Sequence, residues 1–171
     1  MSKVKRKKEM AGSELTFRDD EFIVSKTDLK GKITYGNDLF IKISGYTEEE
    51  LLGAPHNILR NPEMPSLIFK LLWETIKTGE EIFAYVVNKT KQGDYYWVFA
   101  HVTPSTDNDG RIIGFHSVRR KPSDKALSVI KPLYSELLRA EKVGGITASN
   151  QKLTALLQQK GLTYEEFILA I

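Results

Sequence analysis

The feature that most constrains the fold is a run of three strand-like segments near the middle of the chain. Residues 82–89, 95–103 and 111–120 are rich in β-branched and aromatic side chains. A short polar turn, 90–94, joins the first two, and a polar loop, 104–110, joins the second to the third. Strands with links this short pair as antiparallel neighbours, because a parallel connection needs a dozen or more residues. The sequence therefore predicts an antiparallel meander.

Two more strands are predicted upstream. Residues 22–27 and 32–35 flank a turn that contains Gly31, which indicates a hairpin. Helices are expected between the hairpin and the meander. Asn37 or Asp38 can cap a first short helix.

Two further helix starts are visible before the meander. Thr47 and Glu50 form a capping box for a second short helix, and Pro65 fits the first turn of a longer helix that Gly79 ends. The expected fold class is α+β, with a five-stranded antiparallel sheet, short helices on one face and room for a pocket between them.

The last part of the chain reads as a helical extension. Ser123 can cap a helix, Pro132 should kink that helix or mark its start, and Gly144 with Gly145 should break it. A second helix is expected from Ser149 to Lys160, and a final one after a capping box at Thr163 and Glu166. The apolar residues of this extension must pack on something. The expected organisation is a basic tail over 1–19, a folded domain over 20–121 and the extension over 122–171.

Composition excludes several function classes. The net charge is only +3, and five basic residues against one acid lie in the first ten positions. The rest of the chain is therefore close to neutral, unlike a surface that binds nucleic acid. No segment approaches the about 20 apolar residues of a membrane span, and no apolar stretch follows the basic start as in a signal peptide. We expect a cytoplasmic protein.

Chemical motifs are also absent from the sequence. The chain has no cysteine, which excludes disulfides, thiolate metal sites, covalent haem attachment and cysteinyl–flavin photochemistry. It has no nucleophile elbow, phosphate-binding loop, dinucleotide-binding glycine pattern or zinc-protease motif. We therefore expect a protein that is not an enzyme.

The stretch from Asn37 to Gly53 closely resembles the signature of PAS domains, N-x-x-F followed by S/T-G-Y-x-x-x-E-L-x-G. Within that family the chain is similar to the sensor domain of bacterial aerotaxis transducers, the Aer type. The similarity extends over roughly residues 20 to 140. It is carried by Pro55–Pro65, Phe69, Trp73, Val87–Lys89, Gly93–Asp94, Tyr96–Val98 and Pro132–Tyr134.

The resemblance implies a sensor that holds FAD without a covalent bond and uses the flavin redox state as its signal. Arg60, Asn61 and Glu63 fall in the motif that this family uses for the flavin. The family more typically reads Arg-His-Pro-Asp-Met-Pro there, so Asn61 replaces a histidine and Glu63 an aspartate. The chain shows no methyl-accepting signalling domain, so we expect its output to pass to a partner protein. A homodimer through the apolar end helices is also expected.

Several candidate site residues also have roles that do not depend on the resemblance. Arg60 could pair with a phosphate or form a surface ion pair with Glu63. Asn88 lies within a strand, where asparagine is disfavoured, and could bond a flavin edge from the inner face or point outwards. Trp73 could form a wall of the flavin slot or fill the core.

Two other asparagines also allow two interpretations. Asn37 and Asn57 could touch the ligand or cap a helix.

Two alternative hypotheses stay open. The chain could be a cofactor-free PAS interaction or dimerisation module whose centre is filled by side chains. It could also bind haem b, with His56 as the axial ligand.

Overall fold

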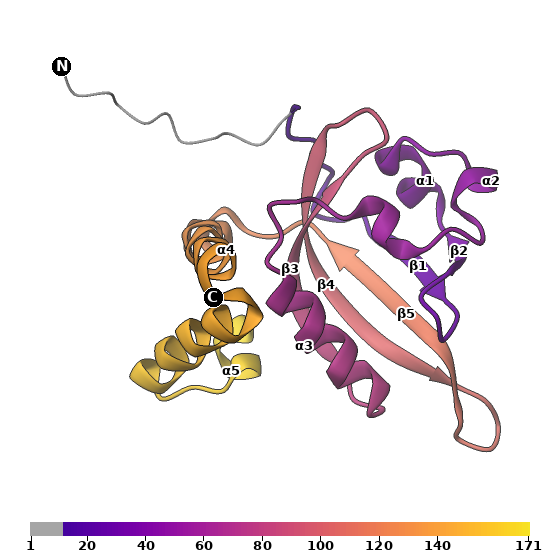
Figure 1. Ribbon diagram of the computed structural model, residues 1–171. Coiled ribbons are helices and arrows are strands. Elements are labelled where there is room, and N and C mark those ends of the chain that lie inside the picture. Colours follow the sequence, from indigo (N-terminus) through magenta and orange to yellow (C-terminus); the bar gives the residue numbers. More distant parts are fainter. Residues whose placement is uncertain (1–11) are drawn as a thin grey trace.

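The computed structural model of the protein describes residues 12–171. The predicted basic run at the start of the chain lies outside the described residues. Five antiparallel strands form one sheet in the order β2-β1-β5-β4-β3, as Figure 1 shows. The strands are β1 Ile23–Thr27, β2 Ile33–Gly36, β3 Ile82–Lys89, β4 Tyr95–Thr106 and β5 Ile112–Arg120. The predicted meander and hairpin are both confirmed, and the hairpin joins the meander through β5.

The predicted helices lie between the hairpin and the meander. They are α1 Asp38–Ser44, α2 Glu48–Leu51, the 3₁₀ helix η1 His56–Leu59 and α3 Ser66–Lys77. The Asn37 side chain accepts a hydrogen bond from the Phe40 N–H, and Thr47 and Glu50 form the expected capping box. Local side-chain bonds therefore set where these short helices begin.

The end of β4 differs from the prediction. The strand runs to Thr106, whereas a loop was expected from Pro104. Pro104 pairs with Phe115 of β5, and the turn is instead built by Asp107, whose carboxylate accepts the N–H groups of Asp109 and Arg111. Pairing with β5 extends the strand past a residue that is locally a poor strand former.

The C-terminal extension consists of α4 Asp124–Lys160 and α5 Tyr164–Ala170. The helix α4 continues through Pro132, so this proline neither starts nor interrupts it. The backbone leaves helical geometry at Gly144 and Gly145, as predicted. Helix geometry resumes directly after these glycines, three residues earlier than the predicted start at Ser149.

The extension packs on the free edge and outer side of β3 and β4. Side chains alternate along a strand, so Tyr85 and Trp97 point away from the short helices, and Trp97 contacts Tyr134 of α4 with ring centroids 6.0 Å apart. The hydroxyls of Tyr134 and Tyr164 donate to the carbonyls of Tyr85 and Phe83 on the edge strand β3. Unpaired strand edges invite association with other chains, so these bonds protect the edge.

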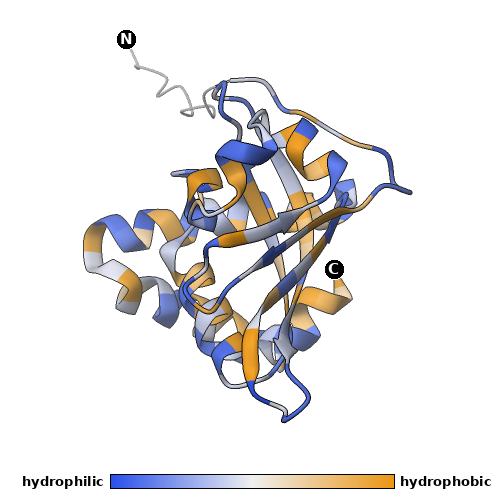
Figure 2. Cartoon of the chain, turned by 90° about the vertical axis from the view of Figure 1, so that its right-hand side faces the viewer, coloured by the Kyte–Doolittle hydropathy of each residue, from blue (hydrophilic) through white to orange (hydrophobic). Residues whose placement is uncertain are grey.

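This packing buries several apolar side chains of the extension, whereas Val129, Val143 and Leu169 stay exposed. Leu153, Phe167 and Ile168 are buried in the common core, and Figure 2 shows apolar segments alternating with polar ones along the helices and strands. The prediction that the extension must pack on something is confirmed. The expected homodimer through the end helices stays a prediction. Within residues 12–171, no helix is long and apolar enough to cross a membrane.

Candidate functional site

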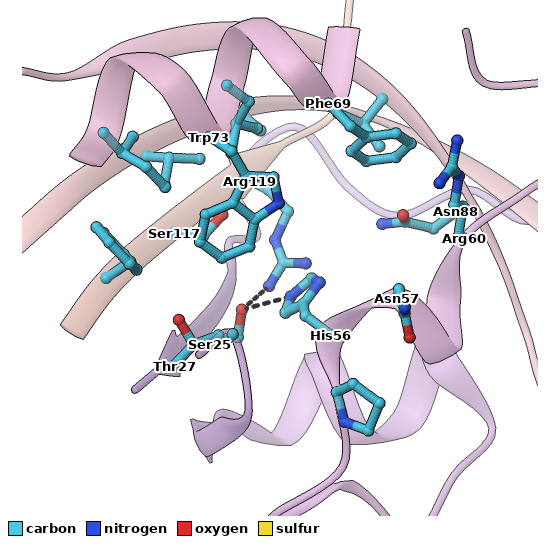
Figure 3. A pocket seen from close by; sticks show the side chains of 18 of the residues that line it. Ser25, Thr27, His56, Asn57, Arg60, Phe69, Trp73, Asn88, Ser117 and Arg119 are labelled. Carbon is cyan, nitrogen blue, oxygen red and sulfur yellow. Dashed lines mark hydrogen bonds between the residues drawn. The ribbon is translucent and has the colours of Figure 1, made fainter. Parts of the chain in front are cut away.

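A cavity of about 450 Å³ lies between the sheet and the helices η1 and α3. This volume is in the usual range for small-molecule sites. Figure 3 shows labelled side chains from β1, η1, α3, β3 and β5 converging on the cavity. Side chains therefore leave a cavity at the centre of the domain. The apolar lining includes Phe69, Leu72, Trp73, Ile76, Val86, Ala100, Val102 and Phe115.

Arg119 of β5 is the main charged group of the deep cavity. It is only 2% exposed, and its Nη2 donates to the Ser25 hydroxyl of β1. Its guanidinium lies 4.9 Å from the ring centroid of Phe40 in α1. The ring packing and the single hydrogen bond fix the orientation of the side chain.

Two nitrogen atoms of Arg119, Nε and Nη1, are buried and have no hydrogen-bond partner among the described residues. Within residues 12–171, no carboxylate forms an ion pair with it. Burial lowers the pKa of Arg119 to about 10, so the group stays a cation at neutral pH. A buried cation whose N–H donors have no hydrogen-bond partner destabilises the fold unless a bound acceptor pairs with them.

His56 stands beside this cation. Its Nε2 lies 3.2 Å from the Ser25 Oγ, which also accepts the bond from Arg119, and its ring stacks on Phe40 at 6.1 Å. Burial and the charge of Arg119 lower the pKa of His56 to about 3, so the imidazole is neutral. The residue proposed as an axial haem ligand therefore lines the cavity. Among residues 12–171, no group of three or more His, Cys, Asp or Glu residues could hold a metal ion.

Asn88 and Trp73 lie on opposite walls of the same cavity. Asn88 is 5% exposed, and Figure 3 shows its amide directed inwards from β3. The strand alternation that the sequence left undecided is thus resolved in favour of the inner face. Trp73 of α3 meets Phe115 edge-on at 5.5 Å and lies close to Gly31. Its indole forms a broad apolar surface against the cavity.

Arg60 and Asn57 are exposed at the mouth of the cavity. The Arg60 Nη2 donates to the Ser66 hydroxyl at 2.9 Å, and its guanidinium lies 4.8 Å from the ring centroid of Phe69. Arg60 makes these two contacts and, among the described residues, forms no ion pair with Glu63. An arginine held at an open mouth is available to an anionic group.

Three predicted site residues lie outside the cavity lining. The Asn37 amide accepts from the Val24 and Phe40 N–H groups and donates to the Phe22 carbonyl, so it is used by the backbone. Asn37 thus caps α1, which is the other role predicted for it, and also ties α1 to β1.

Asn61 and Glu63 belong to the turn that leads into α3. Asn61 is 5% exposed, its side chain accepts from the Glu63 N–H at 2.9 Å, and its carbonyl accepts from Met64. Neither residue lines the cavity. The two departures from the family motif therefore lie in this turn, outside the cavity lining.

Sequence reasoning missed Arg119 and Ser25. One signal was present, because Phe115, Ser117 and Arg119 alternate along β5 and all line the cavity. The sequence alone did not show whether Arg119 or its neighbour Arg120 faces inwards.

Comparison with protein families finds a matching fold family. The family described as PAS fold matches residues 33–119, which include β2, the helices from α1 to α3 and the meander, but not β1 or the C-terminal extension. These residues contain most of the side chains that line the cavity.

Curated relatives match over similar regions. The chain is 43% identical over 119 residues to the aerotaxis receptor of Escherichia coli, covering 70% of this chain and 23% of that protein. It is 31% identical over 87 residues to the biofilm dispersion protein BdlA of Pseudomonas aeruginosa, covering 50% of this chain and 21% of that protein. The chain thus spans less than a quarter of either relative.

Solved structures show the same fold. A light-oxygen-voltage domain studied with a flavin analogue matches with a TM-score of 0.55 at 23% identity, covering 67% of this chain and 86% of that one. The light state of the blue-light photoreceptor Aureochrome1 LOV matches with a TM-score of 0.55 at 23% identity, covering 64% and 86%.

Proposed function

Because the chain belongs to the PAS fold family, we propose that it is a sensor module that binds FAD without a covalent bond and reports the redox state of the flavin to a partner protein. The similarity to the aerotaxis receptor supports this type of sensing, and a light-oxygen-voltage domain of the same fold is described with a flavin analogue. The chain would act by binding and signalling, without turnover.

The single observation that carries the proposal is the buried, incompletely paired Arg119. Its Nε and Nη1 lack partners, and the side chain lines the cavity. The edge of a flavin ring offers acceptor atoms, and a bound flavin supplies a group that gains electrons and negative charge on reduction. A fixed cation next to such a ring stabilises its negative charge strongly, because the surroundings exclude water.

The cavity offers separate places for the two ends of the cofactor. The ring would lie against Trp73 and the apolar lining, with its polar edge towards Arg119 and Asn88. Arg60 at the mouth would hold the diphosphate, because a guanidinium binds phosphate oxygens in pairs. Asn57, exposed beside Arg60, would complete this outer site. The substitutions at Asn61 and Glu63 do not weaken this assignment, since both lie outside the lining.

The same residues can pass on a change in ring charge. Arg119 is bound to Ser25, and these residues belong to paired strands β5 and β1. Asn88 lies on the edge strand β3, which carries the contacts of the C-terminal helices. A stronger pull of the ring on Arg119 or Asn88 would therefore act on both halves of the sheet. A signal requires that the two redox states favour different arrangements of these bonds.

The first test is the absorption spectrum of gently purified protein, followed by identification of the released chromophore. A yellow protein that releases FAD supports the proposal. A haem spectrum would instead favour the alternative built on His56. A protein that stays colourless after incubation with FAD would refute flavin binding.

Paired ligands separate the two ends of the site. R60A should weaken FAD binding by tenfold or more while leaving riboflavin affinity unchanged, because riboflavin has no phosphate; about 1.4 kcal/mol corresponds to tenfold. N88A should weaken both ligands. R111A is the matched control, since Arg111 is exposed on the distant β4–β5 turn. Equal losses of FAD and riboflavin in R60A would contradict the assigned role of Arg60.

A further inference from the structure

The carboxylate of Glu141, on α4, caps the helix that forms one wall of the cavity. Its two oxygens accept hydrogen bonds from the backbone N–H groups of Ser66 (2.9 Å) and Leu67 (3.0 Å), the first two residues of α3. Pro65 directly before them supplies no side-chain cap. A residue 75 positions away therefore satisfies the amides that the start of this helix leaves open, and its negative charge suits that end of the helix.

The same carboxylate also reaches across the break in α4. Glu141 precedes Gly144 and Gly145, and its Oε1 lies 3.1 Å from the hydroxyl of Ser149, which follows them and whose single proton is shared with the Ile146 carbonyl at 3.0 Å. Ser149 is fully buried. One side chain thus ties α3, the first part of α4 and residues 146–171 together.

Arg60 connects this junction to the cavity. It lines the cavity, and its Nη2 donates to the Ser66 hydroxyl. It also lines a second hollow, together with Ser66, Glu141 and Lys142. Among the described residues, neither Arg60 nor Lys142 forms an ion pair with Glu141, so the link from Arg60 to this carboxylate runs through Ser66. Loss of the Arg60–Ser66 bond would free the residue whose backbone N–H donates to Glu141, and so weaken this helix cap.

The break beyond Glu141 has the backbone of a hinge. Gly145 has φ 69° and ψ −166°, a conformation that is essentially restricted to glycine. Val143, beside it, is 92% exposed and holds nothing in place. Residues 146–171 reach the edge of β3 through the Tyr164 hydroxyl and the buried Phe167 and Ile168.

We propose that Glu141 is a latch through which the engagement of Arg60 controls the docking of residues 146–171. When an anionic group at the cavity mouth draws Arg60 away from Ser66, the hold on Glu141 weakens and residues 146–171 loosen about the Gly144–Gly145 hinge. Part of the β3 edge then becomes accessible as the output of the module. The identity of that anionic group as the FAD diphosphate rests on the proposed function.

Variants of the ligand-free full chain test the latch without any flavin. E141Q removes the charge and one acceptor, so amide hydrogen exchange in residues 150–171 should become about tenfold faster, as for the loss of a helix cap. R60A should raise exchange in the same segment about threefold and leave β4 and β5 unchanged. E136Q and R111A are the matched controls, since Glu136 and Arg111 are exposed and line neither the cavity nor the second hollow. Exchange in R60A equal to that of the unaltered chain would overturn the proposal.

Loading with FAD tests the regulation. FAD should speed exchange in residues 150–171 in the unaltered chain and have no further effect in E141Q. Coupling between sites is reciprocal, so E141Q should also bind FAD about threefold more tightly. Binding of FAD with unchanged exchange in this segment would overturn the latch. Failure to bind FAD would refute only the proposed function, because the R60A and E141Q exchange rates in the ligand-free chain still decide the latch.

Discussion

Replacing Arg119 with methionine should change stability and flavin affinity in opposite directions. Burial lowers the pKa of Arg119 from 12.5 to about 10, so keeping the cation in the fold costs about 3 kcal/mol at about 1.4 kcal/mol per pKa unit. Methionine fills a similar volume without charge. It loses the bond to Ser25, worth about 1 kcal/mol, and the contact with the Phe40 ring, worth about 1 kcal/mol.

The net expectation for ligand-free R119M is a gain of about 1 kcal/mol in the free energy of unfolding. The gain should appear as a higher urea midpoint with an unchanged denaturant slope. FAD affinity should fall at least tenfold, because a hydrogen bond from a charged donor contributes about 1.5–3 kcal/mol. Such a trade of stability against binding is typical of functional sites.

The neighbouring residue provides the control. Arg120 is exposed and points away from the cavity, with its guanidinium 5.4 Å from the Phe99 ring centroid. R120M should therefore change stability by less than about 0.5 kcal/mol and leave FAD affinity unaltered. A destabilised R119M that binds FAD as well as the unaltered chain would show that Arg119 supports the fold only, and would refute the reasoning.

Three further predictions follow from the site and its surroundings. The pKa of His56 is about 3 in the folded chain and 6.5 in the unfolded chain, so between these pH values only the unfolded chain binds this proton. The free energy of unfolding should therefore fall by about 1.4 kcal/mol per pH unit as the pH drops from 6.5 towards 3. H56Q should reduce this pH dependence in urea unfolding measured across the same range. G145A should cost about 1–3 kcal/mol in thermal unfolding, against about 1 kcal/mol for G161A, whose φ of 66° and ψ of 31° other residues tolerate better; equal costs would argue against a glycine-only hinge. N61H, which restores the residue common in the family, should cost about 1 kcal/mol through loss of the turn bond to Glu63 while changing FAD affinity less than about twofold in a fluorescence titration; a large gain in affinity would place Asn61 in the site after all.

The cavity has a deep part and an outer part, and variants in each part should change different measured properties. Arg119 and Asn88 are buried and line the deep part where we propose that the ring binds, whereas Arg60 is exposed and lines a second hollow with Glu141 of α4. Variants in the deep part should act on any flavin. Variants at the mouth should act on the phosphates and on the C-terminal helices.

Local sequence determined much of this protein. The capping boxes at Thr47 and Thr163 and the break at Gly144–Gly145 depend on backbone conformation and on bonds between residues three or four positions apart. Strand periodicity and short links likewise sufficed for the meander. The family motif between Asn37 and Gly53 then fixed the fold class. All of these features are visible in one segment at a time, which is why a single sequence shows them.

Tertiary structure decided the site. Arg119 and Ser25 are 94 positions apart, and Glu141 and Ser66 are 75 apart, so no local pattern pairs them. Which arginine of β5 turns inwards depends on the side from which the helices cover the sheet. Strand alternation alone allows both faces, and the burial of apolar residues contributed by the whole chain selects one of them.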